Sequence, residues 1–352
     1  MSRVAVIGAG LTGLAAGWEL VRAGVETFVL ESEQRAGGVI VTERRGGYIV
    51  EGGPDGFLAA ETDLPELAGE LGIEHKLVSQ LAKGSSLWTG VCLEPLEEGR
   101  AATLLGIQEP LQEDLSKGFK SFAGGMADLV EALAERLGSR VALATSVAGL
   151  SRTSRGYRLS LAGGNTLEVD GVVAAVPAWV TAHLLAELGV SAARELEDVL
   201  YYPSLTVSLA YRAEQVTAEL KGTGFVVSGA AEGLGLRACT YASLKYPGRS
   251  PKGHLLFRAF LAPASEDPPT VAHAELARIL GINGAPLWHR VFHWVRGLPR
   301  YRPQHAARVA EIRERLSRMA PLAVSGAGID RAGVSACGRS GRAAARTVLE
   351  RL

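Results

Sequence analysis

The chain has 352 residues, 47% of them hydrophobic and 21% charged, which is typical of a soluble globular protein long enough for two domains with substantial cores. Lysine plus arginine and aspartate plus glutamate both number 37, so no overall charge favours nucleic acid or an anionic membrane as a partner. The 3 cysteines lie far apart without metal-ligand spacing, which indicates a reducing compartment and no metal site.

The N-terminus enters its first predicted strand almost at once, which leaves no room for a charged leader, an apolar segment and a cleavage site. No apolar run approaches the roughly 18 residues that a membrane-spanning helix requires. We therefore expect a cytoplasmic protein, and peripheral contact with a membrane through a surface patch stays an open alternative.

The chain is organised around its first 31 residues. The short apolar run Val4–Ile7 predicts a buried parallel strand, and it leads directly into the glycine-rich turn Gly8–Gly13. Apolar residues at helical spacing predict a helix over Leu11–Val21 that stops at Gly24, and Thr27–Leu30 predicts a second strand. These elements form a complete strand-helix-strand unit.

Each residue type in this turn serves dinucleotide binding differently. Gly8 permits the tight turn, Gly10 lets backbone amides approach a pyrophosphate, and Gly13 lets the helix lie close to the strand. The helix N-terminus offers unpaired N–H groups and a positive dipole end. Glu31, at the end of the second strand, would accept both ribose hydroxyls, which disfavours NADP and leaves NAD and FAD. An accidental glycine turn in an α/β protein is the alternative.

Two further glycine-rich stretches follow within the next 30 residues. Arg35–Gly38 adds a turn whose backbone is suited to lie against phosphate or ribose. Strands at Val39–Thr42 and Tyr48–Val50 form a predicted hairpin, and the chain returns through the glycine loop Glu51–Phe57.

The middle of the chain continues with alternating elements. Helices are predicted at Leu64–Leu71 and Met126–Leu137, separated by a linker at Leu81–Ser116 in which glycines and prolines interrupt every element. Strands between 141 and 176 predict a small antiparallel layer that returns to the nucleotide-binding unit. Another helix is predicted around Leu184–Leu188.

From Pro203 the character of the chain changes to strands bounded by glycine or proline turns. A second, mostly antiparallel sheet is predicted from strands at 206–211, 225–227, 236–241, 255–261 and 288–295, with a helix at 271–280. We interpret this sheet as the substrate domain. A solvated surface helix is predicted at Arg308–Met319, then a buried strand at Leu322–Val324, glycine turns, and a final helix from about Arg339 to Leu352. The last helix can direct its N-terminal amides at the polar edge of a flavin.

Taken together, these segments resemble the flavin-dependent protoporphyrinogen and coproporphyrinogen oxidases within the flavin amine oxidase group. The resemblance rests on Val6–Gly13 with Glu31 and Ser32, on Arg35–Gly38, on Glu51–Phe57, and on Leu322–Gly341, especially Gly333–Gly341. Lesser matches are Phe122–Met126, Ala175–Ala178, Ser243–Pro247 and Trp294 through Tyr301. Only the stretch near 85–118 falls outside it.

The resemblance implies an α/β fold: a Rossmann-like FAD-binding domain of the glutathione-reductase and amine-oxidase type, with a second, mostly antiparallel β-sheet substrate domain. The FAD-binding domain would comprise residues 1–85, 119–180 and 301–352, with a shortened linker at 86–118 in place of a helical insert. The substrate domain would comprise residues 181–300.

The resemblance also implies FAD as the cofactor and identifies the residues that contact it. The first loop would hold the diphosphate, Glu31 and Ser32 the adenosine ribose, and the backbone of Val147 would lie near adenine. Trp294 would lie against the isoalloxazine, although a core aromatic in a strand is an equal alternative. The implied FAD contacts are Gly8, Ala9, Gly10, Leu11, Thr12, Gly13, Glu31, Ser32, Gly38, Val39, Gly53, Pro54, Asp55, Gly56, Val147, Trp294, Gly333, Val334 and Ser335.

Such enzymes oxidise a porphyrinogen, protoporphyrinogen IX or coproporphyrinogen III, to the porphyrin in haem biosynthesis, using O2 and releasing H2O2. The flavin performs the redox chemistry, so no side chain is required as a catalytic base. By analogy Thr223, Gly224, Val226, Phe260 and Leu261 would line the cavity, although each is equally explained as sheet core. Candidates to bind the propionates are Arg44, Arg237, Arg258 and Arg296, and the sequence does not choose among them.

One departure separates this chain from the resemblance. In such enzymes a helical substrate-binding insert, several times longer than the Leu87–Ser116 linker, forms one wall of the pocket, and most of it is absent here. A partner, a dimer neighbour or a smaller substrate would fill the gap, so three alternatives stay open: another flavin amine oxidase, a desaturase, or a flavin-binding protein without oxidase activity. His289 and His293 sit four apart in a predicted strand without an intervening carboxylate, so we predict no metal site.

Overall fold

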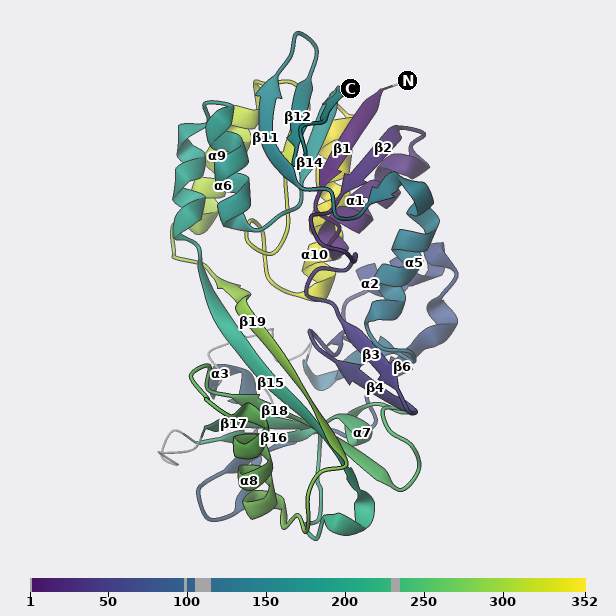
Figure 1. Ribbon diagram of the computed structural model, residues 1–352, viewed down its shortest axis with the longest axis vertical. Coiled ribbons are helices and arrows are strands. Elements are labelled where there is room, and N and C mark those ends of the chain that lie inside the picture. Colours follow the sequence, from purple (N-terminus) through teal and green to yellow (C-terminus); the bar gives the residue numbers. More distant parts are fainter. Residues whose placement is uncertain (1, 98–99, 105–114, 229–234) are drawn as a thin grey trace.

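The computed structural model describes residues 2–97, 100–104, 115–228 and 235–352. Two bodies of secondary structure follow one another along the long axis of the molecule (Figure 1). One holds a parallel sheet and both chain termini, which lie side by side, and the other holds a larger sheet. Two long strands, β15 (Leu200–Arg212) and β19 (Trp288–Arg300), run between them. The predicted fold class is confirmed.

The parallel sheet is built around the first strand of the chain. Its order is β10-β2-β1-β14-β20, and every neighbouring pair is parallel. The strands are β1 (Arg3–Ile7), β2 (Glu26–Leu30), β10 (Val141–Ala142), β14 (Gly171–Ala174) and β20 (Leu322–Val324). Val4 and Val6 enter one hydrophobic core, whereas Ala5 and Ile7 enter another. This strand is apolar throughout because both of its faces are covered.

Helices and a small sheet cover the two faces of the parallel sheet. One core contains residues of α1 (Leu11–Arg22), α2 (Asp63–Leu71), α5 (Ala127–Leu137) and α10 (Val334–Leu349). The other contains residues of α6 (Ala178–Glu187), α9 (His305–Ser317) and the antiparallel strands β11 (Val147–Arg152), β12 (Tyr157–Leu161) and β13 (Thr166–Val169). Within the described ranges, no helix combines the length and the apolar character needed to cross a bilayer.

Seven strands make up the larger sheet, in the order β19-β15-β18-β17-β16-β7-β8. Besides the two long strands, these are β18 (His254–Leu261), β17 (Leu236–Tyr241), β16 (Gly224–Val227), β7 (Ser85–Trp88) and β8 (Leu93–Leu96). All pairs are antiparallel except β16 with β7. The helix α8 (Pro268–Leu280) packs on one face, and its Ala272 and Leu276 enter the sheet's hydrophobic core.

Short elements connect the two bodies. A hairpin of β3 (Thr42–Arg45) and β4 (Tyr48–Glu51) turns at Gly46 and Gly47. The hairpin itself was predicted, but the predicted bounds of its first strand, Val39–Thr42, were wrong, because the chain pairs with β4 through Arg44 and Arg45. A small sheet contains β5 (Phe57–Leu58), β9 (Phe119–Phe122) and β6 (Leu77–Ser79). The remaining described helices are α3 (Arg100–Leu104), α7 (Ala242–Lys245) and four 3-10 helices, at Glu74–Lys76, Gly138–Arg140, Ser191–Asp198 and Ala213–Gln215.

The last helix begins five residues earlier than the sequence pattern predicted. It starts at Val334, and Gly333 is its N-cap with φ +128°, a backbone conformation that suits glycine. The prediction was late because Val334 to Gly338 lack the apolar spacing of the later turns. The predicted surface helix at 308–319 corresponds to α9, which is mostly exposed and buries one face through Val309, Ile312 and Leu316.

The first and last helices pack very closely. A Cβ atom at Gly341 of α10 would lie 2.0 Å from the Thr12 carbonyl oxygen of α1, so this position tolerates no side chain without movement of the backbone. The two ends of the chain therefore converge in one body, as Figure 1 shows for α1 and α10.

Candidate functional site

The three glycines of the first loop occupy different surroundings. Gly8 has φ +98°, and a Cβ atom there would lie 2.6 Å from the Ala175 carbonyl oxygen. A Cβ atom at Gly13 would lie only 1.8 Å from the Gly8 carbonyl oxygen. At Gly10 the nearest protein atom to such a Cβ is the Cα of Gly38, 4.0 Å away. The fold therefore requires Gly8 and Gly13, whereas Gly10 leaves open space in front of the helix N-terminus, as a bound phosphate needs.

Glu31 lies buried at the end of β2, behind the first loop. One carboxylate oxygen accepts the Ala9 N–H at 2.7 Å, and the other accepts the Glu33 N–H at 2.9 Å and the Ser32 hydroxyl at 3.2 Å. The Glu31 carbonyl accepts the Thr145 N–H at 2.7 Å, which brings the start of β11 at Val147 near this carboxylate. Glu31 thus joins the first loop to the segment predicted to lie near adenine.

The second glycine turn is hydrogen-bonded to the first loop. The Gly37 N–H donates to the Ala9 carbonyl at 2.8 Å, and the Arg35 guanidinium donates to the Gly38 carbonyl at 2.6 Å. Val39, which follows, is a large hydrophobic residue that is 44% exposed. A Cβ atom at Gly53 would lie 1.8 Å from the Val39 carbonyl oxygen, so the third glycine loop is in direct backbone contact with this turn.

The turn after β20 and the start of α10 form the last part of the candidate site, beside the first glycine loop. A Cβ atom at Gly326, in the turn after β20, would lie 3.6 Å from the Thr12 hydroxyl of the first loop. Ser335, in the first turn of α10 beside Val334, is 1% exposed, and its hydroxyl has no hydrogen-bond partner among the described residues. A buried donor without a partner is unfavourable unless a ligand satisfies it. The glycine cradle and this hydroxyl fit a bound dinucleotide.

Side chains of the seven-stranded sheet hold the loop at Gly52–Gly56. The Trp294 indole N–H donates to the Gly52 carbonyl at 2.7 Å, and the Arg258 guanidinium donates to the Gly53 carbonyl at 2.6 Å. The Lys245 ammonium, 2.9 Å from the nearer Asp55 carboxylate oxygen, forms a salt bridge beside them. This loop, which includes Pro54 and Gly56, is therefore fixed from the second sheet.

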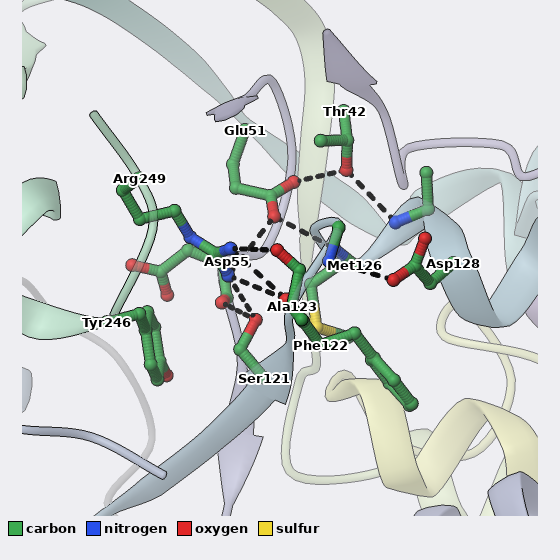
Figure 2. Close-up of polar contacts among 12 residues, drawn as sticks. Thr42, Glu51, Asp55, Ser121, Phe122, Ala123, Met126, Asp128, Tyr246 and Arg249 are labelled. Carbon is green, nitrogen blue, oxygen red and sulfur yellow. Dashed lines mark hydrogen bonds and ion pairs between the residues drawn. The ribbon is translucent and has the colours of Figure 1, made fainter. Parts of the chain in front are cut away.

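A buried charged cluster lies behind the same loop (Figure 2). Arg249, 2% exposed, donates to the Phe122 carbonyl at 3.1 Å, the Ala123 carbonyl at 3.3 Å and the Ser121 hydroxyl at 2.8 Å. Its guanidinium is also 3.9 Å from the Glu51 carboxylate. Figure 2 shows this guanidinium between Glu51 and the end of β9. Arg249 therefore joins the loop before β18 to β4 and β9.

The pKa values of the two carboxyl groups in this cluster shift in opposite directions, because neighbouring positive charges outweigh burial at Asp55 but not at Glu51. Burial raises the pKa of Glu51, against hydrogen bonds from the Thr42 hydroxyl and the Met126 N–H and the charge of Arg249. Burial would also raise the pKa of Asp55, but the charges of Lys245 and Arg258 outweigh it and the pKa is lowered. Asp55 is therefore a carboxylate at neutral pH.

Lys245→Met is expected to destabilise the protein in a pH-dependent way. Because the folded-state pKa of Asp55 lies below its ordinary value of 3.8, its pairing stabilises the fold above that pH, and this contribution is lost as the pH falls through the lowered pKa. The difference in unfolding free energy between wild type and variant should be largest at neutral pH and shrink in acid. Denaturant titrations between pH 3 and 7 measure it; a pH-independent difference would contradict the pairing.

The predicted substrate residues lie on both faces of the seven-stranded sheet. Direct cross-strand partners share a face, and the register places Gly224, Val226 and Phe260 with Arg258 on the face toward the Gly52–Gly56 loop. Leu261 lies on the opposite face, in the core with α8. Thr223, just before β16, donates its hydroxyl to the Gly84 carbonyl at 3.0 Å. Alternation along the strand explains why adjacent Phe260 and Leu261 separate.

The four candidate arginines differ in their partners. Arg44 forms salt bridges with Asp128 and Glu131, both at 2.9 Å, and is held there. Arg258 is buried and bonded to the loop. Arg237 and Arg296 are exposed, and the Arg296 guanidinium carbon lies 4.3 Å from the centre of the Trp179 ring. Of the four, Arg237 and Arg296 are accessible to a carboxylate.

Arg249 and Lys245 belong to the site although the sequence did not assign them a role there. Lys245 falls within the Ser243–Pro247 match, whereas Arg249 lies just outside it. Arg258 was predicted as a candidate for the propionates, and the structure instead bonds it to the loop. In the part of the chain that the structure describes, no group of three or more histidine, cysteine or acidic side chains is arranged to bind a metal.

The chain matches one protein family along almost its whole length. The sequence profile described as "Flavin containing amine oxidoreductase" matches residues 11–90 and 81–349. Coproporphyrinogen III oxidase of Bacillus subtilis (strain 168) is 25% identical, with 98% of this chain and 97% of the relative covered. The Staphylococcus aureus enzyme of the same name is 22% identical, with 99% of each covered.

Solved structures share the fold. A protein from Exiguobacterium sp. 255-15, provisionally named protoporphyrinogen oxidase, superposes with a TM-score of 0.83 at 23% identity, and 99% of each chain is covered. Cyclohexylamine oxidase from Brevibacterium oxydans IH-35A gives a TM-score of 0.77 at 14% identity, again with 99% of each chain covered. The same backbone therefore accompanies different substrates, so the fold alone does not select one.

Proposed function

Because the chain belongs to the flavin-containing amine oxidoreductase family, we propose that it is an FAD-dependent porphyrinogen oxidase. The observation that carries the cofactor assignment is the convergence of the Gly8–Gly13 loop, Glu31, the Gly37–Gly38 turn and the start of α10 on one space. The coproporphyrinogen III oxidases that resemble this chain over nearly its whole length support the substrate class.

Each part of the site has a proposed role in holding FAD. The amides at the start of α1 and the open side of Gly10 would receive the diphosphate, and Glu31 with Ser32 the ribose. The Gly53–Gly56 loop, Trp294 and the amides of Gly333–Ser335 would surround the isoalloxazine. FAD held by these residues would supply the redox chemistry, namely hydride acceptance from the substrate and reoxidation by O2 with release of H2O2. The protein's own contribution is to orient the macrocycle and exclude water.

The substrate would lie against the loop-facing side of the seven-stranded sheet, near Phe260 and Val226. Arg237 and Arg296 are our candidates for its carboxylates. The 461 aligned positions with the Bacillus subtilis relative exceed the 352 residues of this chain by 109, which supports a shortened insert. We propose that the pocket is correspondingly more open than in those relatives, and that contact with a membrane surface or a partner could close it.

The decisive experiment is to purify the protein, record its flavin spectrum, and follow porphyrin fluorescence and peroxide with coproporphyrinogen III and protoporphyrinogen IX under air. Porphyrin and peroxide formed together would support the proposal and identify the preferred substrate. Bound FAD without product from either substrate would remove the oxidase assignment and favour a flavin-binding protein. Turnover of a small amine instead would favour the amine-oxidase alternative, for which the match to the flavin-containing amine oxidoreductase family is the supporting observation.

Glu31→Ala is expected to weaken FAD binding by about 1–3 kcal/mol, because charge-assisted hydrogen bonds to the ribose would be lost. Titration of apoprotein with FAD, followed by the loss of flavin fluorescence, measures the change. Glu33→Ala is the matched control, since Glu33 is exposed and uses only its backbone N–H toward Glu31. Equal affinities for wild type and Glu31→Ala would refute the ribose role.

A further inference from the structure

Arg258 sits where the seven-stranded sheet meets the Gly53–Gly56 loop. Its side chain leaves β18 on the same face as Ser208 and Thr240, its direct partners on the neighbouring strands. The residue is 7% exposed. One guanidinium N–H donates to the Gly53 carbonyl at 2.6 Å, whereas its Nε is buried without a partner among the described residues. A buried guanidinium with few partners is costly, so Arg258 is poorly suited to a purely stabilising role.

The charges around Arg258 divide between the two bodies. The carboxylates Glu51 and Asp55 come from β4 and the loop that follows it, whereas the cations Lys245, Arg249 and Arg258 come from α7, β18 and the loop between them. Burial lowers the pKa of Arg258, and the charges of Asp55 and Glu51 offset only part of this effect. The attraction between these cations and carboxylates therefore links the seven-stranded sheet to the Gly53–Gly56 loop.

The two buried arginines serve different parts of this cluster. All hydrogen bonds that Arg249 donates go to Ser121, Phe122 and Ala123 at the end of β9. Arg258 instead donates to a backbone carbonyl of the loop itself. Both are deeply buried, so loss of either should affect stability. Only Arg258 donates directly to the segment proposed to face the flavin, whereas Arg249 reaches it through the Ser121 hydroxyl, which donates to the Asp55 carbonyl at 2.8 Å.

We propose that Arg258 is a positioning residue that sets the shape of the Gly53–Gly56 loop against the flavin through its direct hydrogen bond, whereas Arg249, which reaches the loop only through Ser121, acts mainly on the stability of the fold. The proposal rests on the proposed function, which places this loop beside the isoalloxazine. It implies that Arg258, a residue of the sheet on which the substrate would lie, affects how the loop contacts the flavin without itself contacting the reacting atoms.

Matched lysine substitutions, Arg258→Lys and Arg249→Lys, test this in the full chain. Both keep a positive charge and lose the fork of guanidinium donors. Arg258→Lys is expected to weaken FAD affinity about tenfold, as the loss of one charge-assisted hydrogen bond would, and to shift the visible absorption of the FAD that remains bound. Arg249→Lys is expected to lose more stability in a denaturant titration while leaving the absorption of bound FAD unchanged. A stability loss alone would not alter the spectrum of bound flavin.

The proposal predicts that Arg258→Lys has the larger effect on FAD binding and that Arg249→Lys has the larger effect on stability. If Arg258→Lys leaves FAD affinity and spectrum unchanged, or Arg249→Lys changes the spectrum more, the positioning role is wrong while the proposed function stands. Arg258→Gln, which keeps a donor without the charge, replaces Arg258→Lys in the same comparison if the latter does not fold. A wild-type protein that folds but takes up no FAD would overturn the proposed function and this inference together.

Discussion

Arg249→Met should lower the unfolding free energy by about 3–5 kcal/mol, the largest effect that we expect from a single side chain in this protein. The guanidinium is buried, and its removal leaves Glu51, two backbone carbonyls and the Ser121 hydroxyl without these contacts. Methionine fills much of the volume but offers no donor, so the loss arises from unsatisfied polar groups rather than from a cavity.

Equilibrium denaturation of the apoprotein measures this loss. Arg158→Met is a suitable control, because Arg158 forms a surface salt bridge with Glu168 at 2.6 Å in which both side chains are about half exposed. Exposed pairs of this kind contribute at most about 1 kcal/mol. Similar losses for the two variants would mean that the buried cluster does not hold the bodies together as described.

Gly13→Ala should prevent α1 from docking on β1. The added methyl group would lie 1.8 Å from the Gly8 carbonyl oxygen, and because backbone cannot yield as a side chain does, we expect a loss of about 3 kcal/mol or more and little FAD binding. Far-ultraviolet circular dichroism, a thermal melt and FAD titration report the three consequences separately. A variant as stable as wild type would show that the helix and strand are not in this contact.

Gly10→Ala in the same loop provides the contrast. Gly10 has ordinary φ and ψ of −67° and 175°, and a methyl group there meets no protein atom closer than 4.0 Å. The apoprotein should therefore keep its stability to within about 0.5 kcal/mol, whereas FAD affinity should fall because the methyl group occupies the space proposed for the diphosphate. An unchanged affinity would place the diphosphate elsewhere.

The comparison of these variants separates what a fold requires from what a ligand requires. Gly8 and Gly13 are explained by protein atoms alone, so their presence in the motif does not by itself indicate a cofactor. Gly10 is not explained by protein atoms, and neither is the buried Ser335 hydroxyl. These two features therefore carry more weight for a bound flavin than the complete glycine pattern does.

Much of the parallel sheet could be predicted because its signals are local. The strand, the glycine turn, the helix and Glu31 follow one another within 31 residues. The spacing of apolar residues within each of these elements is enough to predict whether it is a helix or a strand. The final helix was predicted with a late start because its first turn is set by Gly333, whose positive φ is a property of the folded backbone.

The fold class and the strand-helix-strand unit at the start of the chain follow from the sequence alone, because they depend on short spacings that are the same wherever the rest of the chain lies, and the family follows from the resemblance of its motifs. Only the tertiary structure decided which arginines are held in salt bridges, that Phe260 and Leu261 face opposite sides of the sheet, and that Arg249 and Arg258 are buried beside the Gly53–Gly56 loop. Such contacts join residues far apart in the chain; Gly53 and Arg258, for example, are 205 positions apart. Burial, charge pairing and hydrogen bonding at that separation arise only when the two sheets meet.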